Sequence, residues 1–134
     1  MTLIEFDTLK LGIEEIDTEH WEMFNILDVV LEKVRHNDYD GVNNALDTML
    51  HDFTNHADRE ILIMQNMNFP FIGTHIVAHS ILLAMLEREI KNALRSDYQN
   101  LTDGVESILI DHILQYDVLY AEYAKHIAPQ LESQ

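Results

Sequence analysis

The sequence contains no cysteine and very little glycine or proline. Without cysteine there can be no disulfide, iron-sulfur cluster, thiolate zinc site or cysteine nucleophile, so any metal must be held by histidine or carboxylate side chains. The 134 residues include only four glycines and two prolines, which is typical of a compact helical chain rather than a turn-rich β fold. We therefore expect a single helical domain.

Basic residues are also scarce. Eight Lys and Arg stand against 24 Asp and Glu, giving a net charge of −16. Because this charge repels polyanions, nucleic acid is not expected as a partner. No apolar run approaches the roughly 20 residues of a membrane-spanning helix, and the N-terminus lacks the basic start and apolar run of a secretion signal. We expect no membrane partner and a cytoplasmic location.

Four segments carry apolar residues at helical spacing and are separated by short polar breaks. They are predicted to form helices over about 17–36, 42–67, 71–95 and 102–128. Because short connections place neighbouring helices antiparallel, we expect an all-α, antiparallel, up-down-up-down four-helix bundle. The single domain covers 1–134, with an N-terminal arm over 1–16 and the bundle over 17–128.

Two of the predicted helices have recognisable start signals. Asp17 or Thr18 could cap the first helix, because their side-chain oxygens can accept hydrogen bonds from free backbone N–H groups. Asp103, followed three residues later by Glu106, has the pattern of a capping box at the start of the fourth helix.

Histidines and carboxylates interrupt the apolar stripes of all four predicted helices. An unpaired polar side chain in a bundle core costs about 1–3 kcal/mol, so several together indicate a shared partner such as a metal ion. The candidate metal ligands are His20 on the first helix, His56 and Glu60 on the second, His75 and His79 on the third, and His112 and Asp117 on the fourth.

The candidates also agree in height along the predicted bundle. With the first connection centred near residue 38, His20 and His56 lie equally far before and after it. Applied to each connection, this places all seven residues within about two or three helical turns of 5.4 Å. Within a helix, residues four apart share a face, as in the pair His75 and His79. Convergence of all seven favours a metal site over buried, hydrogen-bonded histidines.

One pair does not fit a regular helix. His112 and Asp117 are five residues apart, which leaves their side chains about 140° apart around a regular α-helix. We therefore predict a π-type bulge between them, a feature often found at functional sites, which would bring the two side chains into line.

The ligand types narrow the choice of metal. Imidazole and carboxylate suit iron, zinc or manganese, and seven ligands suit two carboxylate-bridged ions better than one. The Glu-x-x-His motif of ferritin-like sites and the His-Glu-x-x-His motif of zinc proteases are both absent. The remaining histidines do not fit the cluster and are expected at the surface or beside the ligands: His36, His51 and His126.

These residues resemble the hemerythrins, particularly the single-domain bacterial ones, from about Gly12 to Tyr123. The resemblance rests on Gly12-Ile13 through Ile16-Asp17 to His20, on His56-x-x-x-Glu60 with Met64 and Phe69-Pro70, on His75-x-x-x-His79, and on His112-Ile113 with Asp117. In combination these motifs are specific to that family.

The resemblance implies a non-haem di-iron centre. One iron would be held by His75, His79 and His112, and the second by His20 and His56. Both would be bridged by Glu60, Asp117 and an oxo or hydroxo group. It further implies that the second iron has an open position in an apolar pocket, where dioxygen binds reversibly. The expected function is therefore an oxygen carrier, store or sensor rather than an enzyme.

Four positions depart from the family pattern. Ile108 stands where Trp is common, Ala57 where Phe is common, and Ile61 and Ala78 where Glu is frequent. The smaller side chains at 57 and 108 are predicted to widen access to the site.

Two alternative functions stay open. One is a di-iron enzyme that acts as a peroxidase or oxidase, or in nitric oxide detoxification. The sequence shows neither a general acid in the apolar layer beyond the ligands nor a charged substrate-binding cluster. The other is a helical interaction module with buried, hydrogen-bonded histidines.

Overall fold

A computed structural model describes residues 1–93 and 97–132, with side chains described as far as residue 127. Every regular element in this described part of the chain is a helix, which confirms the all-α prediction. The helices are α1 (Leu3–Asp7), α2 (Glu14–Arg35), α3 (Tyr39–Asn66), α4 (Ile72–Lys91), α5 (Tyr98–His112), the π-helix η2 (Ile113–Asp117) and α6 (Val118–Glu132). None of these helices combines the length and apolarity needed to cross a bilayer.

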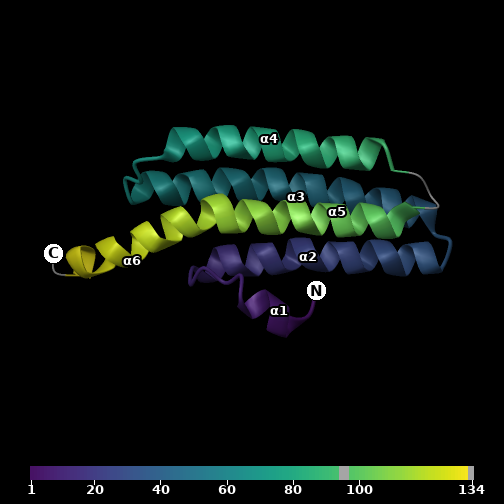
Figure 1. The fold of residues 1–134 in the computed structure, drawn as a ribbon, viewed down its shortest axis with the longest axis horizontal. Helices are drawn as coiled ribbons and strands as arrows, with labels where there is room; N and C mark the ends of the chain where they lie inside the picture. The colour runs from purple at the N-terminus through teal and green to yellow at the C-terminus, as the bar shows by residue number, and fades with distance from the viewer. Residues whose placement is uncertain (94–96, 133–134) are drawn as a thin grey trace.

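The four long helices α2, α3, α4 and α5 lie side by side along their length (Figure 1). In chain order each contacts the next, and α5 also contacts α2, so the four close around a shared interior. The π-helix η2 joins α5 to α6, which extends the same rod towards the C-terminus (Figure 1). This arrangement gives every long helix one face towards the interior.

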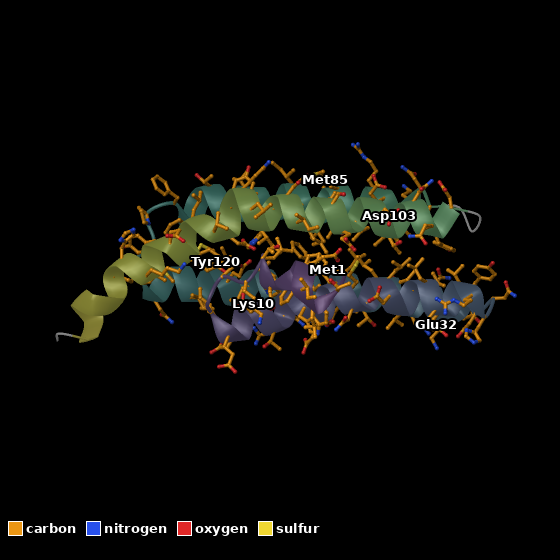
Figure 2. The ribbon with its side chains drawn as sticks, turned by 60° about the horizontal axis from the view of Figure 1, so that its bottom comes forward. Met1, Lys10, Glu32, Met85, Asp103 and Tyr120 are labelled. Atoms are coloured by element: carbon orange, nitrogen blue, oxygen red, sulfur yellow. The ribbon has the colours of Figure 1, made fainter. Side chains whose placement is uncertain are left out.

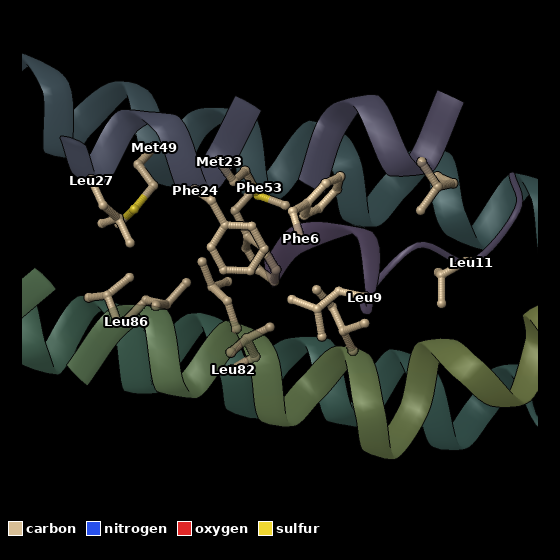
Figure 3. Packing of buried hydrophobic residues seen from close by; sticks show 14 of the residues in the cluster. Phe6, Leu9, Leu11, Met23, Phe24, Leu27, Met49, Phe53, Leu82 and Leu86 are labelled. Carbon is tan, nitrogen blue, oxygen red and sulfur yellow. The ribbon is translucent and has the colours of Figure 1, made fainter. Parts of the chain in front are cut away.

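The interior is filled by apolar side chains from all four long helices. Figure 3 shows Leu27, Met49 and Leu86 facing one another at one end of the cluster, with Phe24, Phe53 and Leu82 further along. Burying each such side chain contributes about 1.5–3 kcal/mol. The residues that the sequence predicted as core are all buried: Phe24, Leu27, Phe53, Met64, Leu82 and Leu86.

The N-terminal arm packs against this core. It contains the short helix α1, whose capping box joins Thr2 and Glu5. The ring of Phe6 lies 5.0 Å from Trp21 and 6.1 Å from Phe24, so the arm covers one side of α2 (Figures 2 and 3). The sequence analysis identified the arm but did not predict its helix.

The predicted cap of the first long helix is wrong. Helix α2 begins at Glu14, so Asp17 and Thr18 lie inside it. The carboxylate of Asp17 instead accepts hydrogen bonds from the backbone N–H groups of Leu11, at 2.7 Å, and Gly12, at 3.1 Å. Gly12 has a φ of 84°, a conformation that glycine adopts without strain. Asp17 therefore fixes the turn that leads from the arm into α2.

The capping box predicted at Asp103 is also wrong. Helix α5 begins at Tyr98, so Asp103 and Glu106 lie inside the helix. The buried side chains of Tyr98, Leu101 and Thr102 show that packing against the core extends the helix beyond its local signal.

Two other helix boundaries, the start of α3 and the end of α4, differ from the predicted ones. Helix α3 begins at Tyr39 because Asp38 caps it, accepting a hydrogen bond from the N–H of Gly41 at 2.9 Å. Helix α4 ends at Lys91, before the predicted end at Arg95, which lies outside the described residues.

Candidate metal centre

All seven predicted ligands are buried, and the fold brings them together. The most exposed of them, His112, is 8% exposed, while Glu60 and Asp117 are fully buried. Their ligand atoms form two groups, and within each group the atoms all lie within 4.8 Å of one another. One group contains Glu60, His75, His79, His112 and Asp117, and the other contains His20, His56, Glu60 and Asp117. The two carboxylates therefore belong to both groups.

Glu60 links the histidines of α3 to those of α4. Its Oε1 atom lies 3.0 Å from Nε2 of His56, one turn earlier on the same helix, and 3.1 Å from Nε2 of His79. The Nε2 atom of His56 also lies 3.1 Å from Nε2 of His20 on α2. Three helices thus contribute polar atoms to one small volume around a single carboxylate.

The π-helix η2 positions the second carboxylate, as the five-residue spacing predicted. It spans Ile113–Asp117, directly after His112. Oδ1 of Asp117 lies 3.2 Å from Nε2 of His112 and 3.0 Å from Nε2 of His75, while Oδ2 lies 3.2 Å from Nε2 of His20. The wider turn therefore brings both ends of the motif to the interior, which a regular α-helix would not do.

Several of these buried atoms have no hydrogen-bond partner. They are both carboxylate oxygens of Asp117, Nε2 of His75, Nε2 of His112 and Nδ1 of His20. An unsatisfied buried polar atom costs about 1–3 kcal/mol, so this concentration requires a compensating partner. Two ligands at right angles, each about 2.1 Å from one ion, stand about 3.0 Å apart, close to the separations observed between these atoms. The cluster could therefore hold metal.

The environment keeps both carboxylates ionised. Burial and the charge of Asp117 would raise the pKa of Glu60, but hydrogen bonds from His56 and His79 lower it to about 2. Burial would likewise raise the pKa of Asp117, but the imidazoles around it, with His112 first, hold it well below its ordinary value. Two anionic oxygen donors at the centre of the cluster suit a cation.

The pKa values of two of the histidines, His56 and His79, shift in opposite directions. Burial would lower the pKa of His56, but Glu60, with a further contribution from Glu19, raises it to about 9. Burial lowers the pKa of His79, and the neighbouring His75 and His112 act in the same sense. A cation at the centre must therefore displace a proton from His56, whereas His79 is already a neutral donor at pH 7.

The sequence analysis missed Tyr120. This residue is fully buried, and its hydroxyl donates a hydrogen bond to Oε2 of Glu60. Burial raises its pKa above the ordinary value, so the hydroxyl keeps its proton. A positional signal was available, because Tyr120 follows Asp117 by three residues, about one helical turn, across the junction of η2 and α6.

The sequence analysis also missed Glu19 and Arg59. The Nδ1–H of His56 donates to Oε1 of Glu19 at 2.9 Å, and Nε of Arg59 lies 2.5 Å from Oε2 of Glu19. Once a cation displaces the Nε2 proton of His56, the proton that stays on Nδ1 leaves the lone pair of Nε2 facing the cluster. The available signals were positional, because Glu19 directly precedes His20 and Arg59 directly precedes Glu60.

A small inner cavity adjoins His20 and His56. It offers about 10 Å³ of space for the centre of a water-sized molecule, which is room for about one such molecule. Apart from the cluster residues His20, His56, His112 and Asp117, its lining is apolar: Met23, Phe24, Phe53, Leu82, Leu109 and Ile113. The cavity therefore suits one very small, uncharged molecule.

Two grooves approach the cluster from outside. The larger, about 600 Å³, lies between α3 and α4 and reaches His79, and Ala57 and Ile61 contribute to its wall. The smaller, about 210 Å³, lies between α4 and α5 and reaches His112, with Ala78 and Ile108 in its wall. All four positions that depart from the family pattern thus line one of these grooves.

The three other histidines lie apart from the cluster. His36, His51 and His126 are exposed, as predicted.

Comparison of the sequence with models of known protein families and with curated proteins finds no match. The geometry of the site is therefore the evidence that bears on the function.

Proposed function

We propose that this chain is a hemerythrin-like protein that holds two iron ions and binds dioxygen reversibly, as a carrier, store or sensor. The observation that carries the proposal is the pair of overlapping buried groups that share Glu60 and Asp117. Two groups with two common carboxylates provide for two ions bridged by those carboxylates, whereas a single ion has no use for seven ligands.

The two groups of ligand atoms also support an assignment of each histidine to one of the two iron ions. His75, His79 and His112 would hold one iron, while His20 and His56 would hold the other. Glu60 and Asp117 would bridge the two, together with an oxo or hydroxo group. Five imidazoles and two carboxylates without a thiolate suit iron, zinc or manganese, and iron is proposed among them because the ligand motifs resemble those of the hemerythrins.

We further infer that the four long helices form an antiparallel up-down-up-down bundle. Its support is the closed series of contacts from α2 through α3 and α4 to α5 and back to α2. The connections of 36–38 and 67–71 are short, as this topology requires.

A pair of ferrous ions held at these residues would supply the electrons for reversible dioxygen binding. The chain's own residues favour this use in two ways. The side with two histidines, His20 and His56, has fewer protein ligands, and it provides two of the three histidines that line the inner cavity, the third being His112. The apolar side chains around that cavity, including Phe24 and Leu109, exclude water from a bound molecule.

The remaining polar neighbours position ligands. The hydroxyl of Tyr120 keeps its proton and donates a hydrogen bond to Oε2 of Glu60, which fixes the rotation of that carboxylate. Glu19 fixes the tautomer and orientation of His56. Both contacts come from residues outside the seven ligands, so they orient the site without occupying it.

The proposal is tested by the visible spectrum of iron-loaded protein. The protein is reduced anaerobically, exposed to oxygen and then flushed with argon. We expect an absorption band that appears with oxygen, disappears on flushing and returns on a second exposure. Oxidation in a single exposure, with no recovery on flushing, would refute reversible binding and favour a di-iron oxidase or peroxidase.

A further inference from the structure

Phe53 borders both the outer α3–α4 groove and the inner cavity. Among the described residues it is the one side chain that lines both the α3–α4 groove and the inner cavity. Its ring stands edge-on to His79, with the ring centroids 6.0 Å apart and the planes at 88°. The ring of Phe53 therefore borders both spaces.

The groove leaves room for this ring to rotate. Ala57 follows Phe53 by one helical turn and lines the groove with only a methyl group. On the other side the ring meets the inner cavity. Rotation of Phe53 about its side-chain bonds would thus connect two existing spaces without moving a helix.

The wall on the α4–α5 side is less able to open. The smaller groove and the inner cavity share Leu82 and His112. His112 is one of the proposed ligands, so it cannot swing aside while it holds a metal ion. Leu82 is not a ligand and could move, but the α3–α4 groove is much the larger, at about 600 Å³ against about 210 Å³. We therefore take the α3–α4 side as the easier way in.

The two spaces also restrict what could pass. The groove contains one carboxylate, Asp58, and the inner cavity has room for about one water-sized molecule, with an apolar lining apart from four cluster residues. The carboxylate in the groove, in a chain with a net charge of −16, disfavours the entry of anions. Small uncharged molecules such as diatomic gases meet no such barrier.

We propose that the α3–α4 groove is the entrance through which a small uncharged molecule reaches the inner cavity, and that rotation of Phe53 controls its passage. This inference rests on the proposed function, because the molecule that enters would be dioxygen. It adds the route and the residue that sets the rate.

The kinetic test compares three variants of the iron-loaded protein by stopped flow. Ala57→Phe fills the groove beside Phe53, Phe53→Leu removes the ring, and Ile108→Phe fills the other groove as the matched control. We expect Ala57→Phe to slow oxygen association and dissociation by a common factor of about ten. Phe53→Leu should accelerate both steps, and Ile108→Phe should change neither.

An equal change in the association and dissociation rates distinguishes an effect on the passage of oxygen from an effect on its binding at the metal. A residue that only controls passage alters both rates and leaves the equilibrium affinity unchanged. The proposal is overturned if Ile108→Phe slows the exchange as much as Ala57→Phe does, or if none of the variants changes either rate.

A second measurement does not depend on oxygen chemistry. In zinc-loaded protein under oxygen pressure, the paramagnetism of dissolved oxygen should accelerate methyl proton relaxation at Leu109 and Ile113 beyond that at the equally buried Val30. Ala57→Phe fills the groove, so it should lower the enhancement at the groove-lining methyl groups of Ile61 and Leu83, and Ile108→Phe should not. Equal relaxation at all three residues would overturn the route. The expected pattern, in a chain whose iron form fails to bind oxygen, would uphold the route and reject only the proposed function.

Discussion

Nδ1 of His56 on α3 lies 2.9 Å from Oε1 of Glu19 on α2. Because a carboxylate on the far nitrogen fixes a metal-binding imidazole, we expect Glu19→Gln to weaken iron binding by about 10–100-fold. Competition with a chelator measures the affinity. Glu22→Gln, at an exposed position on the same helix, is the control. Equal iron affinity in the two variants would rule out a positioning role for Glu19.

Loss of either shared carboxylate should remove both ions. We expect Glu60→Ala and Asp117→Ala to retain little iron, because each residue belongs to both groups. They should also lose the stabilisation that metal provides, about 2.7 kcal/mol when free metal is about 100-fold above its Kd. Metal analysis and denaturant unfolding measure the two effects. Asp47→Ala, at an exposed position on α3, should change neither. Full iron content in both carboxylate variants would contradict the bridging role.

All seven residues of the cluster could be predicted from sequence because their chemistry conflicts with their surroundings. Imidazoles and carboxylates on apolar helix faces require a common partner, and helix geometry then places them at one height. The π-helix followed from the same logic, since His112 and Asp117 could both face inwards only if the turn between them widened.

Other features had no comparable signal. Glu19 and Tyr120 had only a positional signal, since each stands close in sequence to a predicted ligand, and only the packed structure shows which atoms they meet. The starts of α2 and α5 moved because tertiary contacts, such as the buried side chain of Tyr98, outweighed the local capping patterns. The cavities depend on how several helices pack together, which no single segment encodes.

The hydroxyl of Tyr120 should contribute to stability. Tyr120→Phe leaves the ring but removes the hydrogen bond to the buried carboxylate of Glu60. We expect the free energy of unfolding to fall by about 1–3 kcal/mol, the usual cost of an unsatisfied buried acceptor. Tyr123→Phe, which removes a bond of 3.2 Å to the carbonyl of Asn68 at an exposed site, should cost less. Equal losses from the two variants would argue against a special role for Tyr120.

Metal-free protein, prepared with a chelator, should lose stability at alkaline pH. The pKa of His56 is about 9 in the folded chain against an ordinary value of 6.5. The folded state therefore binds more protons than the unfolded state between these values, so stability falls as pH rises through that window. His79 does not offset this change, because its lowered pKa places its titration below the window. Denaturant midpoints measured from pH 6.5 to 9 should decrease, and His56→Gln should flatten the decrease. A midpoint of the unaltered chain that rises over this range would contradict the environment described for His56.

The central claim is that two metal ions share Glu60 and Asp117, and Mössbauer spectroscopy of oxidised protein loaded with ⁵⁷Fe tests it most directly. Carboxylate and oxo bridges couple the spins of neighbouring ferric ions, so we predict two irons per chain in a diamagnetic ground state. A single iron per chain, or two ferric ions with independent paramagnetic spectra, would contradict the shared site.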